Sequence, residues 1–411
     1  MNGLRSVEEQ LADVLPAVRL LPATRRPLAQ ARGATLREPI LARVDLPVFD
    51  NSAMDGFAVR FADVANAAPD APVRLRVVAD LPAGTSDDPA LAPGQAARIM
   101  TGAPMPTAAD AVVPFEDTAD GLDGSLDSAL VLRAPQAAGA HIRRRGEDAH
   151  EGDELLPSGV ALGPLQLAAA AASGNPLLTV SHRPRVAVVS TGTELVEPGL
   201  ALRHGQIPES NGELLAGLVE AAGGVVAIRR SVPDEGGELA RLVAEATDGP
   251  DAVDAVILSG GVSAGAYEVV KTTLSATMTF TKVAMQPGKP QGFGRIRDTV
   301  LFGLPGNPVS VAVSFEVFVR PALLTMQGRT DVHRPVLRLP AASGWRTPSG
   351  RRQYLPVTVD RGDPGRWRVR PATAGGSHLA GSLAHADAYA IVPADVEAVA
   401  PGDIVDVMLI S

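Results

Sequence analysis

The sequence predicts a multidomain protein of the α/β plus β class, and three patterns along the chain lead to this prediction. Between about residues 183 and 326, short apolar runs alternate with helical patterns, which is typical of a doubly wound α/β domain. From residue 46 to 148, runs of alternating apolar and polar residues are separated by Pro-Gly and Asp-Gly turns, which indicates a β-rich domain. Short strands return after residue 332, as in a small β-barrel or sandwich.

The first expected element is an amphipathic helix. Ser6 and Glu9 have the spacing of a capping box, and apolar residues follow at helical intervals at Leu11, Val14, Leu15 and Val18. Residues 25–47 would then form a connecting segment, and a spacer helix would run from Gly163-Pro164 to Gly174. In the α/β region we expect strands at 185–189, 225–230 and 253–258, helices at 211–222, 236–246, 267–275 and 308–320, and apolar stretches near 279–285 and 293–302.

Three strands of the α/β region end in turns rich in glycine, proline and hydroxyl residues. These turns are Thr191–Glu194, Ser259–Gly261 and Gly303–Pro308. Because the carboxyl ends of parallel strands meet at one edge of a sheet, the three turns would line a single crevice with backbone N–H groups. Such a crevice binds anionic small molecules. Any one turn could equally be no more than a helix start, so the prediction depends on the three together.

The composition excludes several classes of function. The 37 basic and 46 acidic residues give a net charge of -9, and aromatic residues make up 3% of the chain, so we expect no nucleic-acid binding. The absence of cysteine excludes disulfides and thiolate chemistry. The N-terminus has charged residues where a signal peptide needs an apolar core, and no apolar run is long enough to cross a bilayer. We therefore expect a soluble cytoplasmic protein with no membrane contact.

Charged residues beside these turns suit a metal ion and an anion. Glu194, Asp234 and Glu268 follow strands at the same expected edge, where their carboxylates could hold Mg²⁺ against substrate phosphates. Each carboxylate taken alone would more often be a solvated surface group. Cations that could neutralise oxyanions stand at Lys282, Lys289 and Arg143–Arg145, with a solvated basic face as the alternative for the arginine run.

A different function is suggested by Gly261–Gly265, which matches the G-x-S-x-G nucleophile elbow of α/β hydrolases. Ser263 would then be the nucleophile, and the base would be His333, His378 or His385. Two observations weaken this hypothesis. Ser259 and Gly260 separate Ser263 from the strand end, whereas an elbow needs its serine on the sharp turn itself, and the histidines fall in the C-terminal β region.

Seven motifs together resemble the MoeA-type molybdopterin molybdenumtransferases, a family related to the C-terminal part of gephyrin. They occur in the family's order over nearly the whole chain, as NSAMDGFA at 51–58, RIMTGAP at 98–104, RRGED at 144–148, STGTEL at 190–195, SGGVS at 259–263, PGKP at 287–290 and GLPGNP at 303–308. The resemblance implies that molybdate and adenylylated molybdopterin give molybdenum cofactor and AMP, with Mg²⁺ assisting.

The resemblance also implies a domain organisation and an assembly. We expect an N-terminal helix at 1–24, an extended linker domain at 25–47 and 149–180, a β-rich domain at 48–148, a molybdopterin-binding α/β domain at 181–328 and a C-terminal β-barrel at 329–411. The implied assembly is an elongated homodimer, with each site between the α/β domain of one subunit and the β-rich domain of the other. Contacts with other proteins of molybdenum cofactor synthesis are also expected.

Residue roles follow from the resemblance in the same way. The implied catalytic residues are Asp55, Thr101, Asp148, Glu194 and Glu268. The implied substrate-binding residues are Arg143, Ser190, Gly192, Ser259, Gly260, Gly261, Ser263, Lys282, Lys289, Pro305, Pro308 and Ser377. The implied Mg²⁺ ligands are Glu194, Asp234 and Glu268.

Three positions depart from the family's pattern. Glu268 stands where the family usually has Asp, Ala266 where an acidic residue is common, and Gln286 where a Lys usually precedes Pro-Gly-Lys-Pro. The longer arm of Glu268 would shift a bound metal, and Gln286 removes a cation from an anion site. These departures leave a second hypothesis open, in which the chain keeps the pocket as a carrier or scaffold with reduced activity.

Overall fold

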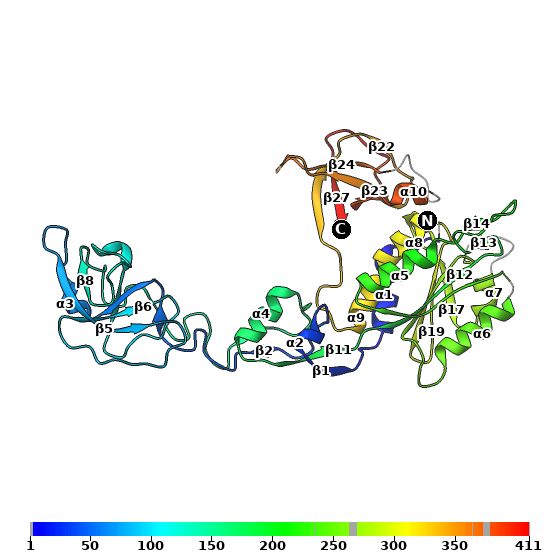
Figure 1. Ribbon diagram of the computed structural model, residues 1–411. Coiled ribbons are helices and arrows are strands. Elements are labelled where there is room, and N and C mark those ends of the chain that lie inside the picture. The colour runs from blue at the N-terminus through cyan, green and yellow to red at the C-terminus, as the bar shows by residue number, and fades with distance from the viewer. Residues whose placement is uncertain (1–2, 235, 263–268, 364, 373–378, 411) are drawn as a thin grey trace.

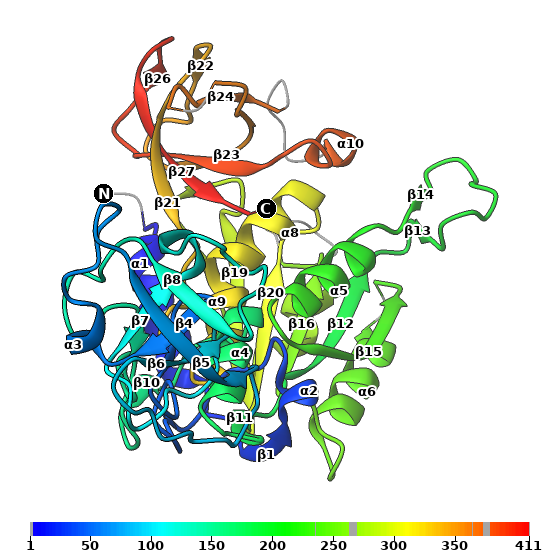
Figure 2. The same ribbon diagram turned by 60° about the vertical axis from the view of Figure 1, so that its left-hand side comes forward.

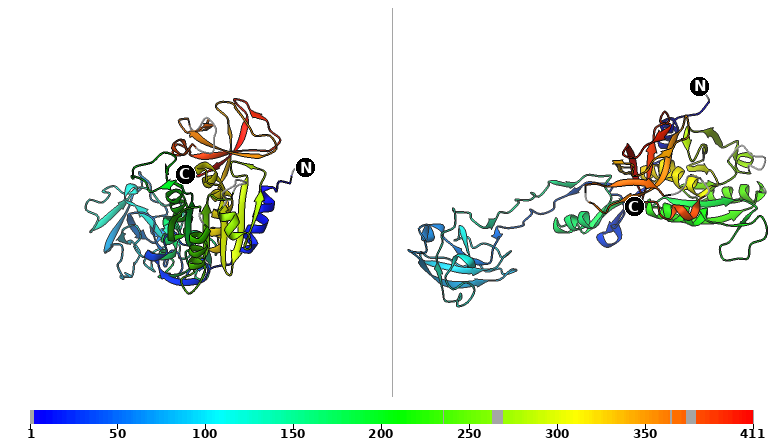
Figure 3. Two further views of the ribbon diagram at one scale, coloured as in Figure 1. Left: turned by 90° about the vertical axis from the view of Figure 1, so that its right-hand side faces the viewer. Right: turned by 90° about the horizontal axis from the view of Figure 1, so that it is seen from above.

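The computed structural model describes residues 3–234, 236–262, 269–363, 365–372 and 379–410. Over this part of the chain the molecule is elongated, with a β-rich domain at one end and an α/β domain and a C-terminal β domain at the other (Figure 1). Seen from above, two extended stretches of chain connect the β-rich domain to the rest (Figure 3). The predicted class, multidomain α/β plus β, is confirmed.

Helix α1 (Val7–Ala17) begins with the expected capping box. Ser6 Oγ accepts from the Glu9 N–H at 3.0 Å, and the Glu9 carboxylate accepts from the Ser6 N–H at 2.7 Å. The linker domain follows as two antiparallel ladders, which pair β1 (Ala23–Pro27) with β11 (Leu177–Ser181) and β2 (Ile40–Leu41) with β10 (Glu154–Leu156). Helices α2 (Leu28–Ala31) and α4 (Pro164–Ala172) pack with these strands around one small apolar cluster.

The β-rich domain is a five-stranded sheet with the strand order β7-β4-β6-β5-β8. Its strands are β4 (Gly56–Val59), β5 (Val73–Leu81), β6 (Gln95–Ile99), β7 (Ala111–Pro114) and β8 (Ser128–Val131). The chain adds a short ladder of β3 (Asn51–Ser52) with β9 (Ile142–Arg143), together with α3 (Phe61–Val64) and η1 (Phe115–Asp117). Phe57 and Val59 enter one apolar cluster and Ala58 enters another, as the alternation of a strand between two buried faces requires.

The α/β domain holds a six-stranded sheet in the order β15-β12-β16-β20-β19-β17. Its strands are β12 (Arg185–Thr191), β15 (Val225–Val232), β16 (Ala255–Ser259), β17 (Met278–Lys282), β19 (Pro290–Ile296) and β20 (Thr299–Leu304). The first four strands in the sheet order are parallel, and β19 is antiparallel to both of its neighbours.

Helices cover both faces of this sheet (Figure 2). Val186 and Val188 of β12 pack in the cluster that includes α5 (Asn211–Ala221) and the core helix described below. Ala187 and Val189 pack on the other face with α6 (Gly236–Thr247) and α7 (Val269–Leu274). A strand that is buried on both faces in this way is apolar at consecutive positions, which is the pattern seen in the sequence.

One continuous helical stretch, Pro308–Met326, runs through the core. It consists of α8 (Pro308–Ser314), the π-helical η2 (Phe315–Val319) and α9 (Arg320–Met326). Its length and composition would also suit a membrane span, but 89% of its apolar window is buried inside the protein, as in a core helix. Within it, the buried carboxylate of Glu316 accepts two hydrogen bonds from Arg334, at 2.9 and 3.0 Å.

The C-terminal domain contains a sheet with the order β18-β23-β25-β27-β21, in which β24 also pairs with β23. Its own elements are β21 (Val336–Pro340), β22 (Trp345–Arg346), β23 (Arg352–Asp360), β24 (Arg368–Pro371), α10 (Ala380–Leu383), β25 (Ala388–Val392), β26 (Ala398–Val399) and β27 (Ile404–Leu409). The edge strand β18 (Met285–Gln286) comes from the α/β domain and pairs with the start of β23. This pairing fixes the C-terminal domain beside the Pro-Gly-Lys-Pro segment.

Candidate functional site

The three predicted turns line one crevice of about 770 Å³ at the carboxyl edge of the parallel strands. Gly192–Glu194 follows β12, Gly260–Gly261 follows β16, and Pro305–Pro308 follows β20. These three strands are adjacent and parallel, so their turns emerge side by side. Further walls come from the ladder of β13 (Leu195–Val196) with β14 (Ile207–Pro208) and from the segment 286–290. The volume suits a small molecule.

Glycines allow the turns to approach one another closely. Gly260 has a φ of +94°, and a Cβ at this position would lie 2.6 Å from the Thr191 carbonyl oxygen. At Gly192 a Cβ would lie 2.7 Å from the Glu194 carboxylate, which folds back over this residue. A side chain at either position would push the neighbouring turn or the carboxylate away. Glycine at these two positions therefore leaves the backbone of the turns open to the crevice, and backbone N–H groups of this kind can cradle an oxyanion.

Two carboxylates, Glu194 and Asp234, line the crevice from neighbouring loops. The loops are tied together because the Asp234 carboxylate accepts from the Thr193 N–H at 3.2 Å and the Asp234 N–H donates to Thr193 Oγ1 at 3.2 Å. This donor set fits Mg²⁺, which takes one or two protein carboxylates and completes its shell with water and substrate phosphates. In the described part of the chain no three acidic or histidine side chains gather as a metal site, and Glu268, the third expected ligand, lies outside that part.

Ser190 and Ser259, which lie at the carboxyl ends of β12 and β16, are buried and do not line the crevice. Ser259 Oγ donates to Ser190 Oγ at 3.3 Å, and Ser190 Oγ donates to the Glu209 carboxylate at 2.8 Å. The same Glu209 oxygen accepts from the Gly212 N–H at 2.8 Å, in the first turn of α5. Glu209 itself lines the crevice, so the two serines position a third carboxylate. No sequence motif marked Glu209 beforehand.

Two cations reach the crevice, one expected and one missed by the sequence analysis. Lys289 lines it from the Pro-Gly-Lys-Pro segment, and Arg351 enters from the C-terminal domain. Arg351 Nη1 donates to Gln286 Oε1 at 2.6 Å, and both side chains are half-buried. The resemblance led us to expect a lysine at position 286. The glutamine found there is a neutral hydrogen-bond acceptor, and it holds Arg351 beside the Pro-Gly-Lys-Pro segment. Lys282, which was also expected here, is exposed at the end of β17 and does not line the crevice.

The other expected residues lie on the β-rich domain, at the far end of the molecule from the crevice (Figure 1). Asp55, Thr101, Arg143 and Asp148 are all exposed, and none of them lines the crevice. The Asp55 carboxylate accepts from the Thr101 N–H at 2.6 Å. This hydrogen bond, followed by one from the Thr101 side chain, lowers the pKa of Asp55 below its ordinary value.

The three consecutive arginines of this domain differ in their partners. Arg144 pairs with Asp50 at 2.6 Å, and Arg145 pairs with Asp45. Arg143, in β9, is exposed and forms no ion pair with the described residues. Of the three, Arg143 is therefore the one whose charge is available to an anion.

Several expected residues lie outside the described part of the chain, namely Ser263, Ala266, Glu268, Ser377 and His378. The serine-hydrolase hypothesis rests on one of them as its nucleophile. Of its other candidate bases, His333 and His385 are described, and neither lines the crevice.

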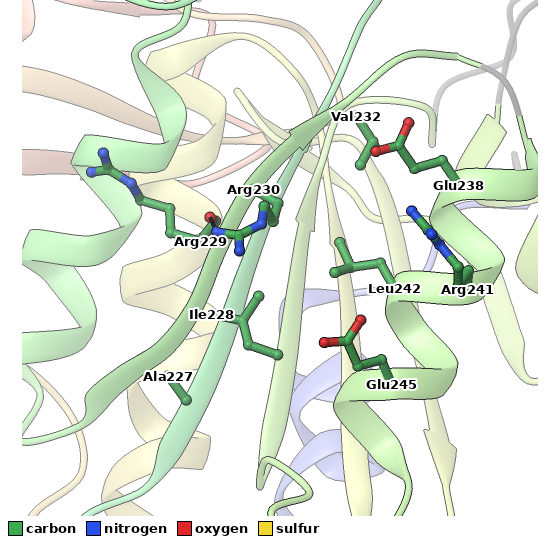
Figure 4. Close-up of a pocket in the computed structure, with 9 residues that line it drawn as sticks. All are labelled: Ala227, Ile228, Arg229, Arg230, Val232, Glu238, Arg241, Leu242 and Glu245. Atoms are coloured by element: carbon green, nitrogen blue, oxygen red, sulfur yellow. Dashed lines mark hydrogen bonds between the residues drawn. The ribbon is translucent and has the colours of Figure 1, made fainter.

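A smaller hollow of about 190 Å³ lies between β15 and α6 (Figure 4). Two arginines, Arg230 and Arg241, line it together with two glutamates, Glu238 and Glu245. Arg229, also at its rim, pairs with Glu213 at 2.5 Å. Because these charges are balanced, the hollow has no surplus charge that would attract an ionic ligand.

Comparison with protein families matches three models to consecutive parts of this chain. The MoeA N-terminal region (domain I and II) matches residues 5–174, a probable molybdopterin binding domain matches residues 187–325, and the MoeA C-terminal region (domain IV) matches residues 338–410. The second of these matches contains all three turns of the crevice.

Individual proteins are similar over the whole length. Molybdopterin molybdenumtransferase 2 of Mycobacterium tuberculosis (strain ATCC 25618 / H37Rv) is 43% identical over 97% of this chain and 98% of its own. Molybdopterin molybdenumtransferase 1 of the same strain is 34% identical over 99% of both chains. The solved structure of the molybdopterin biosynthesis MoeA protein from Pyrococcus horikoshii OT3 is similar with a TM-score of 0.84, at 28% identity, over 99% of this chain and 100% of that one.

Proposed function

This chain belongs to the molybdopterin molybdenumtransferase family, and we propose that its crevice is where molybdate is inserted into adenylylated molybdopterin with release of AMP. It is accordingly an enzyme of molybdenum cofactor biosynthesis. The observation that carries the assignment of the site is the meeting of three glycine- and proline-containing turns with Lys289 and Arg351 in one crevice. The carrier and serine-hydrolase hypotheses are not favoured.

The lining of the crevice suits the chemistry of these substrates. Molybdate and the pyrophosphate link of adenylylated molybdopterin are anions, and the turn N–H groups offer fixed dipoles to their oxygens. Lys289 would act as a compact charge, and the planar guanidinium of Arg351 could hold two oxygens at once. Pro305 and Pro308 stiffen the third turn, so its dipoles are held in place before the substrate arrives.

The charge balance of the crevice supports a role for Mg²⁺. Glu194, Glu209 and Asp234 line it together with two cations, Lys289 and Arg351. A pyrophosphate would be repelled by this surplus of carboxylates unless a divalent cation reversed it. We propose that Glu194 and Asp234 hold Mg²⁺, with Glu268 as the expected third ligand. The bound ion would supply charge neutralisation for the leaving AMP.

We propose that the protein acts as a cytoplasmic homodimer. The β-rich domain lies at the far end of the molecule from the α/β domain (Figure 1), and its Asp55, Thr101, Arg143 and Asp148 do not line the crevice, so in this proposal they act on the substrate of another subunit. In the proposed dimer, the β-rich domain of each subunit faces the crevice of its partner. Contacts with other proteins of molybdenum cofactor synthesis would then use surfaces outside both regions.

The test of the insertion reaction is AMP release from adenylylated molybdopterin as a function of molybdate and Mg²⁺. We expect wild-type protein to release AMP only with molybdate present, and Glu194→Ala to lose most of this activity. Glu197→Ala is the matched control, because Glu197 is an exposed glutamate near the same loop that does not line the crevice. Tight binding of the substrate without AMP release by wild-type protein would contradict the proposal and favour the carrier.

The shared site has its own test, in which two inactive variants are mixed. Asp55→Ala damages the β-rich half of a site, and Glu194→Ala damages the crevice half. If each site uses both subunits, co-expression gives mixed dimers with one intact site, and activity returns to about a quarter of wild type. If both residues act within one chain, the mixture stays as inactive as either variant alone.

A further inference from the structure

A second large cavity, of about 880 Å³, lies between the linker domain and the α/β domain. We call it the arginine groove. Its linker side is formed by β1, the end of α2 and the end of β11, and its other side by the C-terminal ends of α5 and α9. The arginine groove and the crevice share no lining residue.

The charge in the arginine groove is strongly unbalanced. Five arginines line it, together with a single carboxylate, Glu220; the arginines are Arg26, Arg32, Arg183, Arg320 and Arg329. The chain as a whole carries a net charge of -9, so this concentration of cations runs against the general composition. The hollow between β15 and α6, by contrast, is lined by three arginines and two glutamates, and one of these arginines, Arg229, is paired with Glu213 (Figure 4).

Within the described part of the chain, structural partners account for two of these arginines. Arg183 donates to the Gly223 and Gly224 carbonyl oxygens at 3.0 and 2.6 Å, so it supplies hydrogen-bond donors to the carbonyl groups that follow the C-terminal end of α5. Arg320 donates to the Val332 carbonyl oxygen at 3.0 Å and lies 3.8 Å from the buried Glu316. Each of these two side chains therefore has a role in the fold.

The side chains of the other three, Arg26, Arg32 and Arg329, form no hydrogen bond or ion pair with the described residues. Arg26 and Arg32 come from the linker domain, and Arg329 follows α9. Burial lowers the pKa of Arg329 below its ordinary value, and burial together with the neighbouring Arg334 and Arg329 charges lowers that of Arg320. Asp331 offsets part of the Arg329 charge and Glu316 part of the Arg320 charge, but neither of these carboxylates lines the arginine groove.

We propose that the arginine groove is a second anion site, which binds a multiply charged phosphate compound of up to nucleotide size. The volume is in the range of small-molecule sites, and guanidinium groups bind phosphate oxygens in pairs. Because the three unpartnered arginines come from two domains, an anion bound to all of them bridges the linker domain and the α/β domain. The bound compound thus stabilises the junction from which the β-rich domain extends.

Inorganic pyrophosphate is the probe, and its binding to the full-length protein is measured by titration calorimetry at low salt. We expect Arg26→Gln/Arg329→Gln to weaken one class of pyrophosphate site by about tenfold or more. Arg25→Gln is the matched control, since Arg25 precedes Arg26 in β1 and does not line the arginine groove. It should change the affinity by less than about twofold, because successive side chains of a strand point to opposite faces and the exposed Arg25 charge is screened by solvent.

The crevice also binds anions in our proposal, so a second variant separates the two sites. The double variant Lys289→Gln/Arg351→Gln should leave pyrophosphate binding to the arginine groove unchanged. Thermal unfolding without pyrophosphate verifies that each variant is folded. The proposal is overturned if the groove variant binds pyrophosphate like wild type, or if the crevice variant abolishes all binding. It is also overturned if the groove variant changes only the oligomeric state. The arginine groove would then be a contact surface for another protein chain and not an anion site.

Discussion

Arg351→Gln is the sharpest test of how the crevice obtains its positive charge. Arg351 lines the crevice from the C-terminal domain, and its Nη1 donates to Gln286 Oε1 at 2.6 Å. The substitution removes the guanidinium but keeps a polar side chain of moderate length. Lys289 then remains as the other cation among the described lining residues.

The size of the loss in molybdate affinity follows from the charged hydrogen bond that Arg351→Gln removes. A hydrogen bond to a charged group contributes about 1.5 to 3 kcal/mol, and about 1.4 kcal/mol corresponds to a tenfold change in affinity. The molybdate concentration for half-maximal AMP release should therefore rise by roughly ten- to a hundredfold. Gln286→Ala should have a smaller effect, because it frees Arg351 without removing the charge.

The assay is AMP release at saturating adenylylated substrate over a series of molybdate concentrations. Arg346→Gln is the control, because Arg346 is an exposed arginine of the same domain that does not line the crevice. A double-mutant cycle of Gln286→Ala and Arg351→Gln should show coupling well above about 0.5 kcal/mol. Additive effects, or no loss from Arg351→Gln, would refute the reasoning.

Exchanging the two side chains tests whether Arg351 replaces the lysine that the family usually has at position 286. Gln286→Lys alone places an ammonium group against Arg351 and should lower turnover, since two cations then compete for one position. Adding Arg351→Gln should restore much of the loss. If Gln286→Lys alone increases turnover, the native Gln286 is a defect and Arg351 does not compensate for it.

Three further predictions concern single contacts. Glu209→Ala should destabilise the protein by about 1 to 3 kcal/mol in urea unfolding, because Ser190 Oγ loses its acceptor, whereas Glu209→Gln keeps the oxygen and should be much milder. Ser6→Ala should cost about 1 kcal/mol through loss of the cap of α1, which a lower Tm would reveal. Because the pKa of Asp55 is lowered in the folded state, its contribution to stability is present above its unfolded pKa and is lost as the pH falls through the folded pKa. Asp55→Asn should therefore weaken the protein at pH 7, and the difference from wild type should shrink as the pH falls below the ordinary Asp pKa in the same unfolding assay.

The sequence predicted the elements whose signals are local. The capping box of α1 needs only Ser6 and Glu9, three residues apart, and it is present as expected. The strands β12 and β16 are buried on both faces and therefore read as continuous apolar runs. Strand β1 was missed, because its five residues are mostly exposed and carry no apolar alternation.

The site was harder to predict where it depends on distant contacts. Arg351 reaches the crevice because β18 pairs with β23, which joins segments about 65 residues apart and leaves no local pattern. Glu209 is similar, since its role depends on the buried hydroxyl of Ser190. A sequence marks where a strand ends, but not whether its last side chain points into the crevice or below it. That is why Ser190 and Ser259 were expected to bind substrate and are found buried.

The C-terminal domain contributes to both the site and the core, so its deletion cannot separate the two roles. It supplies Arg351 to the crevice, and its Tyr354 and Tyr389 pack with Val309 and Phe318 of the core helix. A chain cut before this domain would expose that apolar face to water and leave β18 without a partner. Loss of activity in such a fragment would follow from the exposed core whether or not Arg351 binds substrate. A single substitution at position 351 leaves the packed face intact, so it can attribute lost affinity to the missing charge.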